Sequence, residues 1–138
     1  LDQMLEAVGG QGKEIIVLGN SAKFNPGGAH PLFDWYLIKS GDPALLQDLN
    51  ALAPKYEDAR SQVYNAEIRH IAEMAGATYL SRRALVCPDH ATCTLVTDDG
   101  FKTMYDDLHW TLEGAARCGA RAADAGWLSS PNVTRVGE

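Results

Sequence analysis

The feature that most constrains the fold is a short run of branched apolar residues between two breaks. Ile15 to Leu18 is unbroken in "KEIIVLGN" and ends at Gly19. Such a run is typical of a strand buried on both faces, as in a parallel sheet covered by helices. Apolar residues precede it at helical spacing: Leu1, Met4, Leu5 and Val8. Because Gly9-Gly10 stops that pattern, the order helix, break, buried strand predicts a layered α/β fold.

The same order of elements returns later in the chain. Residues 43–52 predict a short helix, and Pro54 fits the first turn of a second one, which Gly76 ends. Four apolar residues of that helix share one face: Tyr64, Ile68, Ile71 and Ala75. "ATYLS", residues 77–81, then reads as a second short buried strand. A second helix-to-strand unit supports a parallel sheet, whereas residues 32–39 are too short a segment to assign.

The last third of the chain combines a turn with a helix. "TLVTDDGFKTM" predicts a hairpin around Asp99-Gly100. A helix follows, with Thr111 as its N-cap, Glu113 in its first turn and Gly126 beyond its end. Small and apolar residues give this helix a face suited to close packing on a sheet: Leu112, Ala115, Ala116, Gly119, Ala122 and Ala123.

Length and charge exclude several classes of function. The 138 residues suffice for one domain, and the net charge of -6 argues against binding nucleic acid through a broad basic surface. No apolar run is long enough to span a bilayer, and no signal peptide is present. The chain opens with Leu1 rather than methionine, which indicates a processed protein or a piece of a longer one.

Two of the three cysteines flank a turn that contains proline. Cys87 and Cys93 bound "CPDHATC", and a disulfide between them would imply an oxidising compartment, whereas two free thiols fit the spacing equally well. A zinc site is a further alternative with four candidate ligands: Cys87, His90, Cys93 and His109. Zinc sites prefer cysteines separated by about two residues, so this is the weaker hypothesis.

The stretch "MYDDLHWTLEGA" carries the most chemical content. An acid three residues before a histidine can reach back in a tight turn and bond the imidazole Nδ1, which leaves Nε2 free to take a proton from a serine. Asp106 and His109 have that spacing, and Asp107 is expected to be solvated. Asp-x-x-His is common by chance, so the alternative is a turn capped by Asp106 beside a partly buried His109.

The wider pattern favours the catalytic interpretation. "YDDLHWTLEGA", after "LVCPDHATCTLVTDDG", resembles the last block of the SGNH (GDSL-like) hydrolase fold. It is most similar to the SGNH domains fused to membrane acyltransferases that O-acylate bacterial surface polysaccharides. Five residues match the block: Asp106, His109, Thr111, Gly114 and Ala115. Trp110 departs from the usual leucine, a change of bulk that should leave the Asp-His pair intact.

The resemblance implies a fold and a location. The fold is a three-layer parallel-sheet SGNH-hydrolase-like (flavodoxin-like) α/β domain, of which residues 1–128 form only the C-terminal part and 129–138 a tail. "GKEIIVLGNSAKFNP" resembles the late core strand, and "NAEIRHIAEMAGATYL" resembles the helix and strand before the cysteine loop. A cysteine pair precedes the final block in many members, which implies a Cys87–Cys93 disulfide and the periplasmic side of a bacterial inner membrane.

The resemblance also implies a function. Asp106 and His109 supply two members of a Ser-His-Asp triad that transfers or hydrolyses an acyl ester, most simply acetyl, on cell-surface carbohydrate. No metal or dissociable cofactor is needed. The expected partners are the acylated carbohydrate, an upstream SGNH segment and a membrane acyltransferase domain, and no nucleic acid. The alternative is a non-catalytic carbohydrate- or partner-binding module derived from the same fold.

The sequence contains no clear nucleophile for this triad. Members of the family carry serine in a Gly-Asp-Ser motif, with glycine and asparagine loops that complete the oxyanion hole, and none of these is clear here. We expect them upstream, so that this chain alone is inactive. The second candidate is Ser21 in "LGNSA", but Asn20 replaces the expected aspartate and the distance in sequence to His109 is short. Ser21 is better explained as a loop serine.

Overall fold

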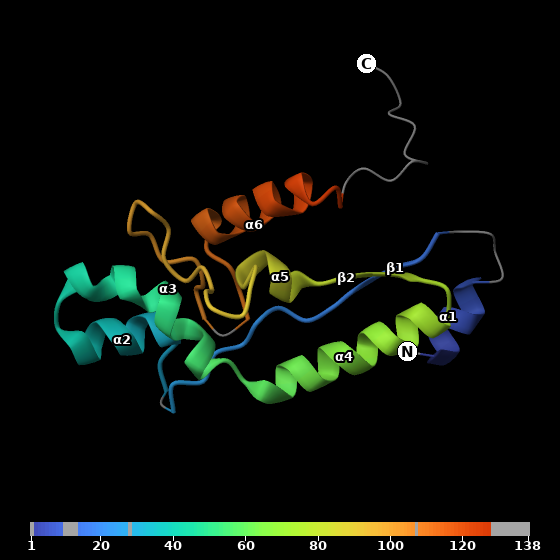
Figure 1. The fold of residues 1–138 in the computed structure, drawn as a ribbon, viewed down its shortest axis with the longest axis horizontal. Coiled ribbons are helices and arrows are strands. Elements are labelled where there is room, and N and C mark those ends of the chain that lie inside the picture. Colours follow the sequence, from blue (N-terminus) through green and yellow to red (C-terminus); the bar gives the residue numbers. More distant parts are fainter. Residues whose placement is uncertain (1, 10–13, 28, 107, 128–138) are drawn as a thin grey trace, which may run out of the picture.

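A computed structural model describes residues 2–9, 14–27, 29–106 and 108–127. These residues form an elongated molecule in which helices flank a short central pair of strands (Figure 1). The predicted tail, Leu1 and Asp107 lie outside the described residues.

The two predicted helix-to-strand units form, but the second strand is not buried as predicted, because Thr78 is exposed and Tyr79 and Leu80 are half-buried. Helix α1 (Asp2–Gly9) leads to strand β1 (Ile16–Leu18), and helix α4 (Ala59–Met74) leads to strand β2 (Thr78–Leu80). The strands pair in parallel, with Val17 opposite Tyr79. The parallel α/β character is therefore confirmed. The described sheet has two strands, so the three-layer arrangement of a complete domain stays a prediction.

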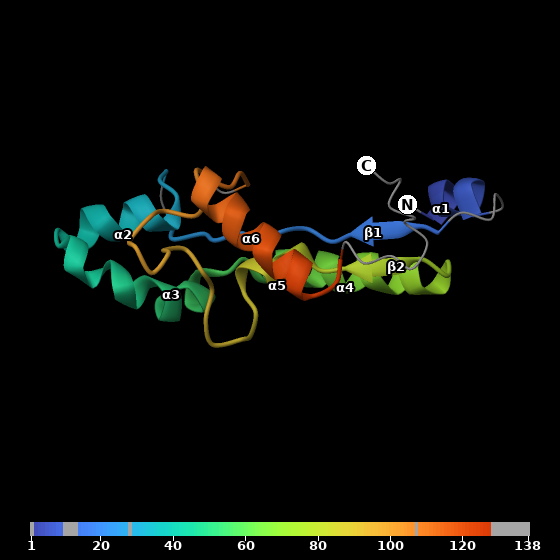
Figure 2. The ribbon, with the colours of Figure 1, turned by 90° about the horizontal axis from the view of Figure 1, so that it is seen from above.

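The prediction that β1 is buried on both faces is wrong. Ile16 and Leu18 are 45% and 53% exposed, and only Val17 between them is half-buried. The physical reason is that α4 runs along one side of the strand pair, while helix α6 (Leu112–Asp124) lies farther along the molecule, over helix α5 (Arg82–Val86) (Figures 1 and 2). One face of the pair is thus left without a covering helix among the described residues.

Helix α4 differs from its prediction at its start and in its buried face. Pro54 lies in a separate 3-10 turn (Ala53–Tyr56), and α4 begins only after Asp58, whose carboxylate accepts from the Arg60 amide. The buried residues of α4 are Asn65 and Ala72, whereas Tyr64 and Ala75 of the predicted stripe are exposed.

Asn65 explains why α4 buries a different face from the predicted one. Its Oδ1 accepts from the Asn20 amide at 2.7 Å, and its Nδ2 donates to the Asn20 carbonyl at 3.1 Å. A buried amide that satisfies both polar groups of one backbone residue fixes how α4 faces the loop after β1. Polar contacts, rather than the apolar stripe, therefore set the orientation of α4.

The main core lies away from the strand pair. It is surrounded by helix α2 (Leu32–Ser40), the 3-10 helix Pro43–Asp48 and helix α3 (Leu49–Leu52). Helices α5 and α6 and the hairpin around Gly100, in which Val96 pairs with Lys102, also contribute to it. The buried residues at its centre come from several of these elements: Phe24, Leu49, Ala53, Val86, Cys87, Cys93, Val96 and Met104. Cys87 and Cys93 form a disulfide inside this core, with their Cα atoms 4.0 Å apart.

Helix α6 begins as predicted but packs through a different face. Thr111 is its N-cap, and the Thr111 Oγ1 accepts from the Gly114 amide at 3.1 Å. The buried residues are Gly114 and Cys118, whereas Leu112 of the predicted packing face is 82% exposed. The helix packs on α5 and on the hairpin rather than on the strand pair, and the Arg121 Nη1 donates to the Leu85 carbonyl at 2.6 Å.

Gly114 is the position in α6 where a side chain cannot fit. A Cβ there would lie 1.9 Å from the Thr103 carbonyl oxygen, whereas a Cβ at Gly119 would meet nothing within 4 Å. We predict that Gly114→Ala destabilises the fold by about 1–3 kcal/mol, because the clash with backbone outweighs the helix propensity of alanine. Gly119→Ala is the matched control and should stabilise by up to about 1 kcal/mol. Urea unfolding of both variants measures the difference, and equal midpoints would contradict the packing.

Candidate active site

The loop that carries Asp106, Leu108 and His109, here called the dyad loop, is closed at its base by backbone pairing. The Tyr105 amide donates to the His109 carbonyl at 2.7 Å, and Met104 pairs with Trp110 in an antiparallel bridge. One residue farther from the turn, the Thr111 amide donates to the Thr103 carbonyl at 3.0 Å. The dyad loop is therefore a short antiparallel turn that leads directly into α6.

Asp106 contacts His109 within this turn. The His109 Nδ1 lies 2.8 Å from Oδ2 and 3.0 Å from Oδ1 of Asp106. The same Oδ1 accepts from the amides of Leu108 and His109, each at 2.8 Å. Since an ionised carboxylate only accepts, Nδ1 of a neutral imidazole must carry the proton and Nε2 must be unprotonated. The His109 side chain is 73% exposed, so Nε2 is open to a reacting group.

The hydrogen bonds keep Asp106 ionised. They lower the pKa of its carboxyl from 3.8 to about 2, through the Leu108 amide first, then the His109 ring and the His109 amide. A group that orients a catalytic histidine must remain a carboxylate over the working pH range. The turn geometry therefore secures the charge state of Asp106, and not only its position.

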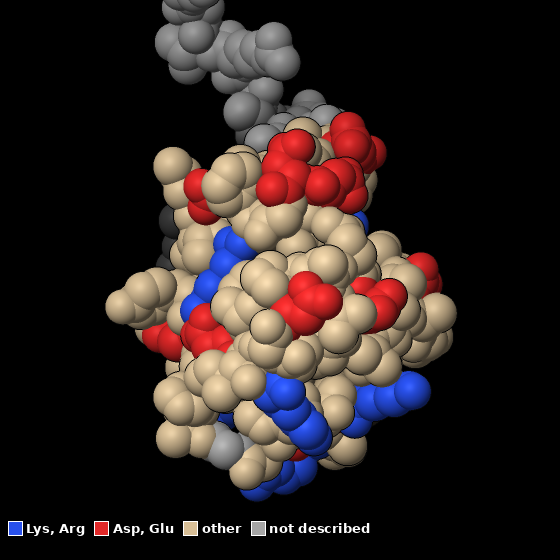
Figure 3. All heavy atoms as spheres, turned by 90° about the vertical axis from the view of Figure 1, so that its left-hand side faces the viewer, with Lys and Arg blue, Asp and Glu red and all other residues tan. Residues whose placement is uncertain are grey.

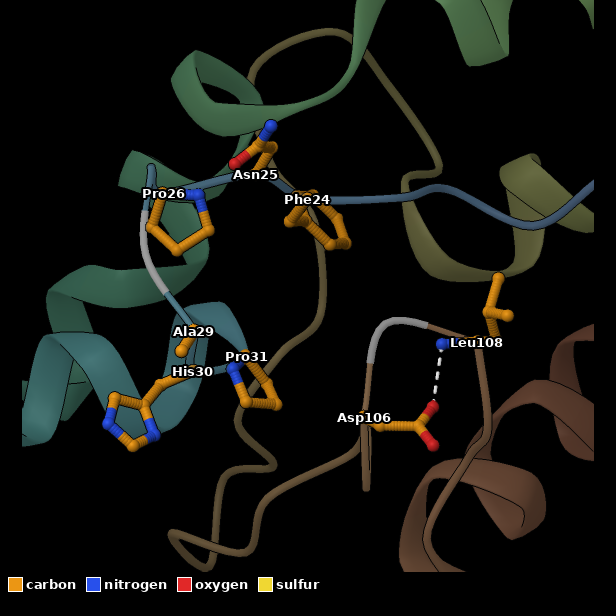
Figure 4. Close-up of a pocket in the computed structure, with 8 residues that line it drawn as sticks. All are labelled: Phe24, Asn25, Pro26, Ala29, His30, Pro31, Asp106 and Leu108. Carbon is orange, nitrogen blue, oxygen red and sulfur yellow. Dashed lines mark hydrogen bonds between the residues drawn. The ribbon is translucent and has the colours of Figure 1, made fainter.

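Two cavities meet at Leu108. The first, of about 330 Å³, lies between the loop after β1 and the dyad loop. Its lining residues are Phe24, Asn25, Pro26, Ala29, His30, Pro31, Asp106 and Leu108. Figure 4 shows the Asp106 carboxylate turned toward the Leu108 amide, with the His30 ring on the far side of the hollow. The second cavity, of about 360 Å³, is lined by Ser21 and Lys23 on one side and by Leu108 on the other.

The structure does not bring Ser21 into contact with the Asp-His pair. The Ser21 Oγ is buried from solvent and has no hydrogen-bond partner among the described residues. A nucleophile must reach both the substrate and the base that takes its proton. Ser21 lines the second cavity, but among the described residues no hydrogen bond joins its hydroxyl to His109, so its candidacy as nucleophile gains no support from the geometry.

The zinc hypothesis has no ligand set in the described part of the chain. Cys87 and Cys93 are bonded to each other, and His109 is bonded to Asp106 through Nδ1. No three His, Cys, Asp or Glu side chains converge among the residues the structure describes.

One group beside this site could not be identified from the sequence. Arg82 begins α5, and its Nε donates to the Gly19 carbonyl at 2.8 Å, so the arginine lies at the end of β1 and lines the second cavity. Only the parallel pairing of β1 with β2 brings it there, because 63 residues separate the two positions. No local spacing in the sequence signals that contact.

The pKa of Asp106 gives a test of the dyad loop. We predict that its carboxyl titrates with a pKa of about 2. Because the folded pKa lies below the ordinary 3.8, its stabilisation of the loop is present above about pH 4 and is lost as the pH falls toward 2. The measurement is a ¹³C NMR titration of the Asp106 side chain. In His109→Ala the pKa should stay below 3.8, since the Leu108 amide remains; a return to 3.8 would contradict this geometry.

Comparison with known proteins identifies the family. No curated protein and no solved structure matches the chain significantly. Among the described helices, none is both long and apolar enough to cross a membrane. A family model described as "SGNH domain (fused to AT3 domains)" matches residues 1–124, which confirms the resemblance expected from the final block. The chain therefore belongs to the family of SGNH domains that are fused to AT3 domains.

Proposed function

We propose that this chain supplies the acid–base pair of an SGNH-type enzyme that transfers or hydrolyses O-acyl groups, most simply acetyl, on cell-surface carbohydrate. The observation that carries the proposal is the contact of 2.8 Å between the His109 Nδ1 and the Asp106 Oδ2, on a loop that leaves Nε2 free. The family supports it, because its SGNH domains are fused to AT3 domains.

The proposed reaction has two steps, acylation of a serine and deacylation of the acyl-serine. A serine Oγ attacks the acyl carbonyl carbon while the His109 Nε2 takes the hydroxyl proton, and a tetrahedral intermediate forms. His109 then returns the proton to the leaving sugar oxygen, the ester bond breaks and an acyl-serine remains. In the second step, a water or an acceptor hydroxyl gives its proton to Nε2 and attacks the carbonyl carbon of the acyl-serine. The bond from that carbon to the serine Oγ then breaks, His109 returns the proton to Oγ, and the free acid or the new ester leaves. Asp106 stays ionised throughout and stabilises the imidazolium.

The nucleophile is proposed to come from a further SGNH segment that packs against the described residues. Two observations support this: the Ser21 hydroxyl is buried and has no hydrogen-bond partner in the described part of the chain, and β1 exposes Ile16 and Leu18. An exposed apolar strand face that ends beside a candidate site is suited to cover by another part of the same domain. The same surface would serve a non-catalytic module, so activity must decide between the two functions.

The location follows from the same reasoning. A membrane acyltransferase domain is the partner that an AT3 fusion suggests. The Cys87–Cys93 disulfide fits an oxidising compartment. We therefore place the domain on the periplasmic side of a bacterial inner membrane, where it meets acylated carbohydrate.

Ester hydrolysis tests this function. We expect the 138-residue chain alone not to hydrolyse p-nitrophenyl acetate, and a protein that also holds the preceding SGNH segment to hydrolyse it. In that longer protein, His109→Ala and Asp106→Asn should each lower kcat by about 10³–10⁴-fold, because the base is lost or held in the wrong tautomer.

Ser21→Ala is the control in the longer protein, and its activity should be unchanged. Full activity in the His109→Ala variant would overturn the proposed role of the dyad. Activity of the short chain that Ser21→Ala abolishes would instead reassign the nucleophile to Ser21. A longer protein without esterase or acetyl-transfer activity would favour the non-catalytic module.

A further inference from the structure

The second cavity differs in charge from the rest of the molecule. It lies between the loop after β1, the start of α4, the start of α5 and the dyad loop. Its ionisable side chains include three cations and one carboxylate: Lys23, Arg60, Arg82 and Asp58. The chain as a whole carries a net charge of -6. The described lining of this cavity therefore carries an excess of positive charge in a protein that is acidic overall.

Asp58, the carboxylate among the described lining residues, is paired with a neighbour. The Asp58 Oδ2 lies 2.9 Å from the Arg60 Nη2, and the Asp58 Oδ1 accepts from the Nε and the amide of Arg60 at 3.2 Å and 3.0 Å. These bonds and the Arg60 charge lower the pKa of Asp58, so it stays ionised and paired. Because Asp58 and Arg60 neutralise each other, the net charge of the described lining comes from Lys23 and Arg82 and is positive.

Arg82 is held with its terminal nitrogens free. Its Nε donates to the Gly19 carbonyl at 2.8 Å, which fixes the plane of the guanidinium, and among the described residues neither Nη has a hydrogen-bond partner. A guanidinium whose two terminal nitrogens are both free matches a carboxylate or phosphate, which it can bind through two parallel hydrogen bonds. Lys23, half-buried in the same wall, adds a second positive charge.

The rest of the wall suits a sugar ring. Tyr64 is exposed on the first half of α4 and lines the cavity, where its ring offers a flat apolar surface with a polar edge. The exposed Asn20 adds an amide side chain. The volume of about 360 Å³ lies within the range of about 300–1,000 Å³ that is typical of small-molecule sites.

The neighbouring cavity provides an internal contrast. Its ionisable lining residues that the structure describes are Asp106 and His30, with no lysine or arginine among them. Figure 3 shows that, on the end of the molecule that carries α2 and α3, acidic side chains lie at the top and across the middle, whereas most basic ones lie toward the bottom. Of the two cavities that Leu108 lines, the second is therefore the one suited to an anion.

We propose that this second cavity binds an acidic saccharide unit, whose carboxylate or phosphate group contacts Lys23 and Arg82, beside the dyad loop. Leu108 lines the cavity, and its amide bonds Asp106, so a ligand there lies next to the candidate catalytic pair. This inference rests on the proposed function and narrows its substrate to anionic carbohydrate.

The test is binding, measured by ¹H–¹⁵N NMR titration of the 138-residue chain. Three probes are compared: digalacturonate, its neutral dimethyl ester and glucose 1-phosphate. We expect at least one acidic probe to shift the amides of residues 20–23, 60–64 and 108, and the neutral ester to bind at least about tenfold more weakly. Binding of digalacturonate alone identifies a carboxylate ligand, and binding of glucose 1-phosphate alone identifies a phosphate ligand. Equal binding of the neutral ester, or no binding of either acid, would overturn the proposal.

Variants locate the anion. Arg82→Gln and Lys23→Gln should each weaken binding of the acidic probe by about tenfold. Lys55→Gln is the matched control, because Lys55 is exposed on the 3-10 turn Ala53–Tyr56 and lies outside the cavity. If Arg82→Gln disturbs the loop after β1, Lys23→Gln still decides, since no hydrogen bond of the fold involves the Lys23 side chain among the described residues. Variants that bind like Lys55→Gln would contradict the assignment.

This experiment is separable from the test of activity. His109 does not line the cavity, so His109→Ala should bind the acidic probe normally. Loss of binding without loss of dyad-dependent hydrolysis would refute only the acidic ligand. Binding by a longer protein that lacks esterase activity would refute only the catalytic role.

Discussion

The candidate site depends on the close approach of α6 to the strand-like segment before the dyad loop. At Gly114 the helix backbone lies very close to the Thr103 carbonyl. A Cβ added to Gly114 would lie only 1.9 Å from the Thr103 carbonyl oxygen. Thr111 links the start of α6 to the same segment: its Oγ1 donates to the Lys102 carbonyl at 2.6 Å and accepts from the Gly114 amide. The helix start, its cap and the base of the dyad loop are thus one unit, and the threonine and glycine of the final block have a structural reason.

Residues 94–96, which pair with that segment across the hairpin, are held by partly buried polar contacts. The Asn50 Oδ1 accepts from the amides of Leu95 and Val96, and its Nδ2 donates to the Val96 carbonyl at 2.8 Å. Arg121 bonds the Leu85 carbonyl and the Thr94 Oγ1. The segment has few regular strand partners, so these side chains satisfy backbone groups that would otherwise be buried unpaired. A fixed base lets the exposed dyad loop keep its geometry.

The sequence predicts best what depends on neighbours in the chain. The Thr111 cap, the turn at Gly100 and the Asp106–His109 contact each arise within a few residues, and all three are present. What depends on distant partners could not be foreseen. The buried face of α4 follows from Asn65 and the Asn20 backbone, and the face of α6 follows from the approach at Gly114. The cationic cavity joins residues from four separate segments, so no motif reveals it.

The protonation of His109 tests the central claim most directly. If Asp106 holds the imidazole for acid–base chemistry, ¹⁵N NMR of the neutral ring should show the proton on Nδ1 and a free lone pair on Nε2. The Nδ1 signal should change in Asp106→Asn, since the carboxylate acceptor at 2.8 Å is lost. A neutral His109 protonated on Nε2 would contradict the account, because the nitrogen that must accept the serine proton would already carry one.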